Sequence, residues 1–283
     1  MKRVLHFLKN IFIKSIHVVQ KVKKNGFYAT AEVIYHFICK LFQRKIEEYG
    51  LKKYLFRFPA FLYAKKLPLN ADRYLVIAPH PDDEVFGCAG IIHRLSQLGK
   101  KVHVVILTQG EAVHDEPKID IQTLVARRRE LALDAAKIMG LLPEQYSFFD
   151  WGDDKVREDN IHESKVKELV TIIDAIKPEV IFTPHLADVH LDHTHTAKIV
   201  SNLISPSTKQ IYYCVWLLWY QSHKPQWNKS YVLKMSKKER FIKEKAMDAY
   251  VLPIDEYGMP YSGDLRELAS ITRWRKELFF EAQ

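Results

Sequence analysis

Cysteine is scarce in this chain, and its three cysteines form no known spacing pattern. Cys39, Cys88 and Cys214 are odd in number, far apart and outside any Cys-x-x-Cys spacing. A disulfide framework and a cysteine-based zinc site both need paired cysteines, so the sequence favours neither. We therefore expect a protein of a reducing compartment, the cytoplasm.

Long uncharged apolar runs are also absent. Charged side chains interrupt the N-terminal region at Lys9, Lys14, Glu32, Lys40 and Arg57. No stretch therefore reaches the roughly 18 apolar residues that a membrane-spanning helix needs. No apolar segment followed by small residues marks a cleavable signal. We expect neither a spanning helix nor a secretory signal.

Phosphate-binding glycine loops are missing as well. The chain has no Walker A lysine loop, and no GxGxxG follows the first strand of the body, where HPDDEVFGCAG stands at 80–90. The acidic side chains of this stretch would repel a pyrophosphate. The sequence therefore argues against a nucleotide-binding protein.

Positive charge is concentrated at the N-terminus. Residues 1–70 hold 15 Lys and Arg against 3 Asp and Glu, whereas 71–283 hold 28 against 31. Apolar residues recur at helical spacing in 1–70, which predicts a basic amphipathic helical extension. Two roles stay open for it: peripheral docking on an anionic membrane at its inner face, or packing against protein. Nucleic-acid binding is not expected, because no reader motif accompanies the charge.

The body, 71–283, alternates strand-like and helix-like segments. Short apolar runs predict strands at 73–79, 101–110, 178–184 and 210–220. Helical spacing with start and stop residues predicts helices at 87–99, 121–139, 163–176 and 195–204. The alternation predicts an α/β fold, a Rossmann-like three-layer sandwich with a mostly parallel sheet. Ligands of such sheets bind beyond the carboxyl ends of the strands.

Two clusters of polar side chains follow predicted strands. In HPDDE, 80–84, Pro81 favours an extended conformation at His80, and the adjacent Asp82 and Asp83 of a turn point in different directions. One aspartate can therefore bind a metal with His80 while the other faces a water. The second cluster offers His185, Asp188, His190, Asp192, His193 and His195.

Together, the clusters contain the groups of a hydrolytic metal site. Two histidines and one carboxylate suit a divalent ion such as zinc and leave room for water and substrate. A further carboxylate can then accept a proton from water whose pKa the metal has lowered to about 7. The sequence thus predicts metal-assisted hydrolysis.

HPDDE after a strand, with the distal HLDH at 190–193, resembles the PIG-L/LmbE-like family of zinc-dependent deacetylases, which act on N-acetylglucosamine-containing molecules. The resemblance runs from about residue 72 to about residue 200. It includes VVILTQGEA at 104–112, ARRRELALDAAKIMGL at 126–141 and FFDWGDD at 148–154. It implies that 71–283 is a deacetylase domain acting on an N-acetylated amino sugar. A lipid-linked or cell-envelope glycan precursor is the expected substrate class.

The resemblance also implies the role of each matching residue. The implied ligands of Zn²⁺, or of another divalent metal, are His80, Asp83 and His193. The implied catalytic residues are the general base Asp82, the oxyanion-stabilising His190, which also protonates the leaving amine, and its supporting Asp192. Arg127 would hold the substrate, with Arg128 as the alternative because consecutive arginines blur the match.

Three other interpretations stay open. An amidase could cleave a larger acyl group or a thiol conjugate, depending on loops such as 111–120. A non-catalytic membrane-associated scaffold could use the metal only to brace its fold. HPDDE could also be a solvated turn whose aspartates cap the next helix, and Glu84 is expected to orient neighbours or to start that helix.

Overall fold

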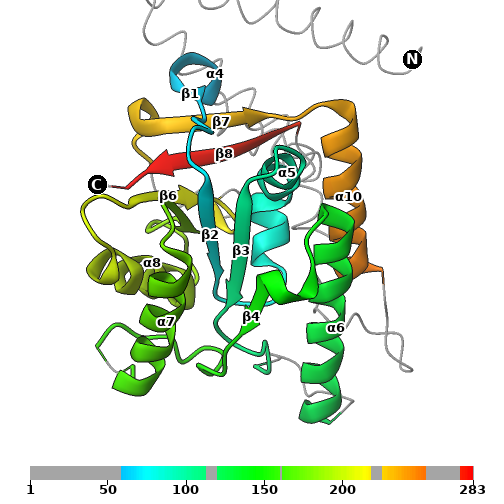
Figure 1. Ribbon diagram of the computed structural model, residues 1–283, viewed down its shortest axis with the longest axis vertical. Helices are drawn as coiled ribbons and strands as arrows, with labels where there is room; N and C mark the ends of the chain where they lie inside the picture. The colour runs from blue at the N-terminus through cyan, green and yellow to red at the C-terminus, as the bar shows by residue number, and fades with distance from the viewer. Residues whose placement is uncertain (1–58, 113–119, 160, 218–224, 253–274, 283) are drawn as a thin grey trace, which may run out of the picture. The chain divides into compact units, whose positions relative to one another are not determined.

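The computed structural model describes residues 59–112, 120–159, 161–217, 225–252 and 275–282 (Figure 1). Most of the predicted extension lies outside these residues. Its helices, its membrane docking and the domain boundary near residue 70 therefore stay predictions. No helix in the described ranges is both long and apolar enough to cross a membrane.

The described strands form one sheet in the order β1-β7-β8-β6-β5-β2-β3-β4. The strands are β1 (Lys65–Lys66), β2 (Arg73–Ala78), β3 (Lys101–Ile106), β4 (Tyr146–Phe148), β5 (Val180–Pro184), β6 (Lys209–Tyr213), β7 (Ser230–Lys234) and β8 (Lys276–Glu281). β8 runs antiparallel to both of its neighbours, and the other neighbouring pairs are parallel. The predicted mostly parallel α/β fold is confirmed.

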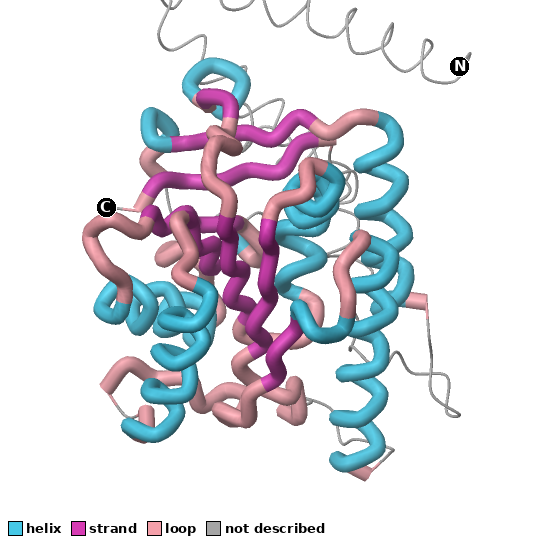
Figure 2. Tube along the Cα trace, viewed as in Figure 1, coloured by secondary structure: helices cyan, strands magenta, loops and turns pink. Residues whose placement is uncertain are grey.

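Helices cover both faces of this sheet (Figures 1 and 2). The helices are α4 (Pro59–Tyr63), α5 (Asp83–Gln97), α6 (Ile121–Met139), α7 (Glu163–Ile176), α8 (Leu191–Leu203) and α10 (Lys237–Val251), with 3-10 turns η1 (Pro143–Gln145) and η2 (Trp227–Lys229). One hydrophobic cluster joins α5, α6 and α10 to the sheet, and a second joins α7 and α8 to it. The molecule thus has three layers.

The sequence of β2 explains why both faces are buried. Tyr74, Val76 and Ala78 belong to the cluster under α5, α6 and α10, whereas Leu75 and Ile77 belong to the cluster under α7 and α8. Side chains alternate between the faces of a strand, so a run that is apolar at every position must be covered twice. This run therefore places β2 in the interior of the sheet.

The helix after β2 begins earlier than predicted. It starts at Asp83 rather than at residue 87, with Asp82 as its N-cap residue. Asp83 and Glu84 are therefore part of the first helical turn, where their negative charges face the positive end of the helix dipole. The helix fixes the direction of both carboxylates.

Candidate active site

The fold brings the two polar clusters together. β2 and β5 are parallel neighbours, and their carboxyl ends lie at Ala78 and Pro184. HPDDE follows the first of these ends, and the histidine-rich segment that leads into α8 follows the second. The predicted site is thus at the edge of the sheet where such folds bind ligands.

Asp82 is held in a strained turn beside this edge. Its φ angle is 127°, a backbone conformation that residues other than glycine rarely adopt and that costs on the order of 1–3 kcal/mol. The Asp82 N–H donates to Glu84 Oε2 (3.0 Å), and Tyr250 donates to the other Glu84 oxygen (2.9 Å). Glu84 is fully buried, and burial raises its pKa to about 7. Glu84 therefore supports the turn, as its expected orienting role requires.

Three predicted ligand atoms converge at one point. Asp83 Oδ2 lies 3.1 Å from His80 Nδ1 and 3.1 Å from His193 Nε2, and the two nitrogens are 3.4 Å apart. Tetrahedral zinc with bonds of about 2.0–2.1 Å to its ligands needs ligand atoms about 3.3 Å apart. All three side chains are buried. The donor set and its spacing therefore fit a zinc ion.

The charges around these atoms also favour a cation. Burial alone would lower the pKa of His193, but the carboxylates of Asp83 and Asp188 outweigh burial and raise this pKa to about 9. Burial would likewise raise the pKa of Asp83, but the two histidines lower it. The carboxylates in this pocket thus attract positive charge, whether proton or metal.

Of the two candidates Arg127 and Arg128, it is Arg128 that reaches the site. Its guanidinium donates to Gly110 O (2.6 Å), Pro81 O (3.2 Å) and Asp82 Oδ2 (3.1 Å), and the residue is buried. Arg127 pairs with Glu130, its neighbour on the exposed side of α6. Helix α6 therefore directs Arg128 inward, while the substrate-holding role of Arg127 stays a prediction.

His190 lies beside the ligand cluster. Its ring centroid is 4.6 Å from that of His80. Burial, followed by the positive charges of His193 and His80, lowers the pKa of His190 to about 4. His190 is therefore a neutral imidazole at neutral pH, able to donate one hydrogen bond.

Asp192 contacts other partners than the predicted one. Its Oδ1 accepts from Arg157 (2.5 Å), and its Oδ2 lies 3.3 Å from His80 Nε2. Toward His190, one carboxylate oxygen of Asp192 comes within 4.8 Å of a ring nitrogen, and an oxygen of Asp154 lies within the same distance of both. Asp192 thus acts on His80 and Arg157 more directly than on His190.

Sequence reasoning did not single out Asp153 or Arg157, and it gave Asp188 no role. Asp153 Oδ1 lies 3.0 Å from His80 Nε2, and Asp188 Oδ2 lies 3.5 Å from His193 Nδ1. Asp153 stands in the FFDWGDD stretch and Asp188 in the second polar cluster. Those stretches were visible in the sequence, but the pairing with a particular imidazole nitrogen was not.

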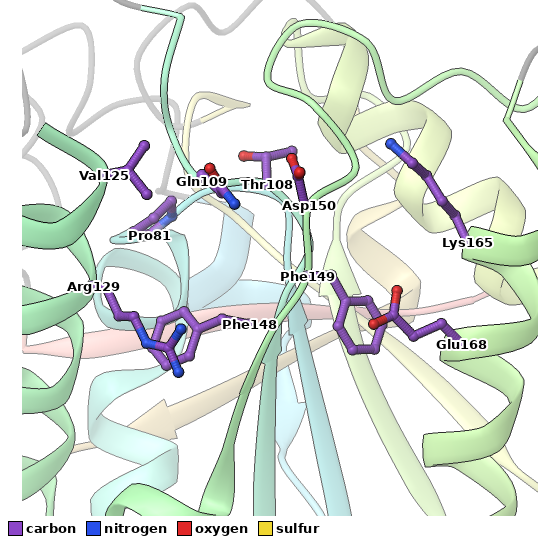
Figure 3. Close-up of a pocket in the computed structure, with 10 residues that line it drawn as sticks. All are labelled: Pro81, Thr108, Gln109, Val125, Arg129, Phe148, Phe149, Asp150, Lys165 and Glu168. Carbon is purple, nitrogen blue, oxygen red and sulfur yellow. The ribbon is translucent and has the colours of Figure 1, made fainter. Parts of the chain in front are cut away.

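A groove with a mixed polar and apolar lining lies next to this site, between α6 and α7. It has a volume of about 270 Å³ and is lined by Pro81, Thr108, Gln109, Val125, Arg129, Phe148, Phe149, Asp150, Lys165 and Glu168 (Figure 3). The Arg129 guanidinium lies 4.6 Å from the centroid of the Phe148 ring. None of the predicted ligands lines the groove, so it is separate from the ligand cluster, although Pro81 is the neighbour of Asp82.

Comparison with known proteins identifies the segment that contains this site. Residues 75–204 match the PIG-L family, described as GlcNAc-PI de-N-acetylase. The diacetylchitobiose deacetylase of Thermococcus kodakarensis is 30% identical over 135 residues, which are 45% of this chain and 48% of that protein. The chain thus spans about half the length of this curated relative.

Solved structures show the same fold. The N,N'-diacetylchitobiose deacetylase of Pyrococcus horikoshii, in complex with an inhibitor, has a TM-score of 0.60 at 20% identity, covering 83% of this chain and 92% of its own. The 4-carboxy-2-hydroxymuconate hydratase of Pseudomonas putida has a TM-score of 0.57 at 17% identity, covering 75% and 96%. Because a deacetylase and a hydratase share it, the fold alone does not decide the reaction.

Proposed function

We propose that this chain, whose residues 75–204 match the PIG-L family, is a metal-dependent hydrolase that removes the N-acetyl group from an N-acetylglucosamine-containing substrate. The observation that carries the proposal is the convergence of His80 Nδ1, Asp83 Oδ2 and His193 Nε2 at 3.1–3.4 Å beside a separate carboxylate, Asp82. Ligation and proton transfer are then tasks of different side chains.

The three converging residues would hold Zn²⁺. Once bound, the ion would supply a Lewis acid next to the acetyl carbonyl and the attacking water. Asp83 and the imidazoles of His80 and His193 already lie at tetrahedral spacing, so little rearrangement of the side chains is needed. The preformed arrangement lowers the reorganisation that the reaction requires.

Asp82 accepts the proton of the attacking water. Burial and the negative charge of Asp83 raise the pKa of Asp82 well above its ordinary value, which makes its carboxylate a stronger base than an exposed aspartate. The positive charge of Arg128 opposes part of this rise, and its hydrogen bond to Asp82 Oδ2 orients the carboxylate. Asp82 then returns the proton to the amine that leaves, so that acetate and a free amine result.

His190 stabilises the negative charge that develops on the acetyl oxygen. Its lowered pKa of about 4 leaves a neutral ring with one N–H to donate. A neutral imidazole is a poor proton donor to an amine. The oxyanion role predicted for His190 is therefore supported better than the acid role.

The substrate is expected to be an amino sugar that carries a further group. The relative from Thermococcus kodakarensis is named for diacetylchitobiose, whose acetylated amino sugars are the class implied by the resemblance. The basic extension 1–70 leads us to propose a lipid-linked or cell-envelope glycan precursor, reached at the inner face of the membrane. Flotation of the full chain with anionic liposomes tests this part separately: a chain that stays in the soluble fraction contradicts membrane docking.

A free-amine assay tests the reaction. The full chain, loaded with zinc, is incubated with N-acetylglucosamine lipids, nucleotides, thiol glycosides and oligosaccharides. We expect release of acetate and amine in equal amounts from at least one of these. A chelator should abolish the release and added zinc should restore it. Release of a larger acyl group would favour the amidase, and no release from any N-acetylated compound would contradict the proposal.

Two arginine variants test the assignment of Arg128. Arg128→Met removes hydrogen bonds from a charged group to Asp82 and Gly110. The bond to Asp82 alone is worth about 1.5–3 kcal/mol, so its loss should lower kcat/KM by roughly 10- to 100-fold. Arg127→Met, one residue away on the same helix, is the matched control and should change kcat/KM less than about threefold. A larger loss from Arg127→Met would return the substrate-holding role to Arg127.

A further inference from the structure

Each nitrogen of His80 faces a different group of partners. Nδ1 lies 3.1 Å from Asp83 Oδ2 and 3.4 Å from His193 Nε2, so it is the nitrogen that points to the proposed metal position. A neutral imidazole carries one proton, and a metal needs the lone pair of the unprotonated nitrogen. Ligation by Nδ1 therefore requires the proton to be on Nε2.

Two carboxylates lie within reach of His80 Nε2. Asp153 Oδ1 is at 3.0 Å and Asp192 Oδ2 at 3.3 Å, and all three residues are buried. Only one can be the principal acceptor of a single N–H. The surroundings of the two carboxylates decide between them.

Asp153 is the better acceptor of the two. Its Oδ2 accepts from Ala112 N (3.1 Å), and its backbone N–H donates to Glu111 Oε1 (2.8 Å), so both the side chain and the backbone of Asp153 are held in place. The negative charge of Asp192 is already paired, because its Oδ1 forms an ion pair with Arg157 at 2.5 Å. Asp153 is also closer to the imidazole nitrogen.

We propose that Asp153 is a positioning residue, which accepts the Nε2–H of His80 and so fixes the tautomer that presents Nδ1 to the metal. This inference rests on the proposed metal centre but not on the identity of the substrate. Asp153 touches neither the substrate nor the metal in this account. It acts only through the orientation and the proton of His80, as carboxylates behind metal-bound histidines do.

Zinc affinity of the full chain is the first test, measured by competition with a chromogenic chelator. Asp153→Asn should weaken zinc binding about 10- to 100-fold. Asp174→Asn, which removes the same charge from an exposed position of α7, should leave the affinity unchanged. Asp192→Asn should weaken binding less than Asp153→Asn does. Unchanged affinity in Asp153→Asn, or a larger loss in Asp192→Asn, would overturn the proposal.

A second measurement needs no variant and so does not depend on the folding of one. In the zinc-loaded wild-type chain, ¹⁵N-detected NMR of the His80 ring should show a proton on Nε2 and none on Nδ1. A proton on Nδ1 would overturn the proposal. If the wild-type chain bound no zinc, the proposed function would fail instead, so the two failures are distinguishable.

Discussion

Replacing Glu277 by Gln should destabilise the protein strongly, because Glu277 is one half of a buried ion pair. Glu277 and Lys243 are 3% and 2% exposed, and Lys243 Nζ lies 2.7 Å from Glu277 Oε1. The Glu277 carboxylate also accepts from the N–H groups of Gly90 (2.7 Å) and Ile91 (2.8 Å), and Lys243 donates to Phe86 O (2.8 Å). The pair thus connects β8 and α10 to the backbone of α5, the helix that begins at the candidate active site.

The magnitude follows from the burial of the partner that remains. Glu277→Gln leaves the Lys243 ammonium buried without its counter-charge, and removing one partner of such a pair costs about 3–5 kcal/mol. Lys243→Met on its own should also destabilise. The double variant, which has no buried charge here, should be more stable than the sum of the single effects predicts, by about 1–3 kcal/mol.

Urea unfolding of the metal-free chain measures these free energies. Glu281→Gln is the matched control on the same strand: its partner Lys209 lies 3.0 Å away, but both side chains are about 40% exposed, so the cost should stay below about 1 kcal/mol. Equal costs for Glu277→Gln and Glu281→Gln, or strictly additive effects in the double variant, would refute the reasoning.

Two further predictions concern the positioning of Arg128 and the stability in acid. Replacing Gly110 by Ala should cost about 1–2 kcal/mol in backbone strain, because its φ angle is 69°. Replacing Gly99 by Ala should cost as much, because its φ angle is 68°. Only at Gly110 would the new Cβ collide with Arg128, at 2.5 Å, so only Gly110→Ala should also lower kcat/KM; equal activities would contradict this. Arg94 lowers the pKa of Glu239 to about 2, so Glu239 stabilises the fold above its unfolded pKa and this contribution is lost as the pH falls from about 5 towards 2. The stability difference between wild type and Glu239→Gln, measured by urea unfolding, should therefore be largest near pH 7 and shrink in acid; a constant difference would contradict the assignment.

Local sequence signals predicted the elements that position the site. Helix α6 begins after Asp120, whose side chain accepts from Thr123 N, and ends at Gly140, whose φ of 89° suits glycine. The apolar run of β2 and the prolines and charges that follow it marked the end of a buried strand. These features are encoded within a few residues of each other, which is why a sequence can reveal them.

The C-terminal part of the fold could not be predicted in the same way. β7 pairs with β8, whose register joins Ser230 to Phe280, so each strand depends on a segment far away in the chain. Helix α10 is rich in charge, and its buried face includes Lys243. Its apolar periodicity is therefore weak. The ion pair with Glu277 and the hydrogen bond to Phe86 O make that lysine compatible with the interior.

The roles of the side chains at the site could likewise be predicted only in part from the sequence. The three side chains that converge at the candidate site, His80, Asp83 and His193, stand in motifs that the sequence shows, but the choice between Arg127 and Arg128 did not follow from the sequence. Consecutive arginines on a helix point about 100° apart, and the packing of α6 against α5 and α10 decides which one faces inward. Asp153 could not be assigned, because its partner lies 73 positions earlier in the chain and only the fold brings the two together.

The division of labour between Asp82 and Asp83 is the central claim, and Asp82→Asn tests it most directly. The zinc content and the rate of acetate release of this variant are measured on the same preparation of the full chain. We predict wild-type zinc content, because Asp82 is not a ligand, and a loss of at least about 100-fold in rate, because the general base is gone. A variant that keeps its rate, or that loses its zinc, would contradict the account.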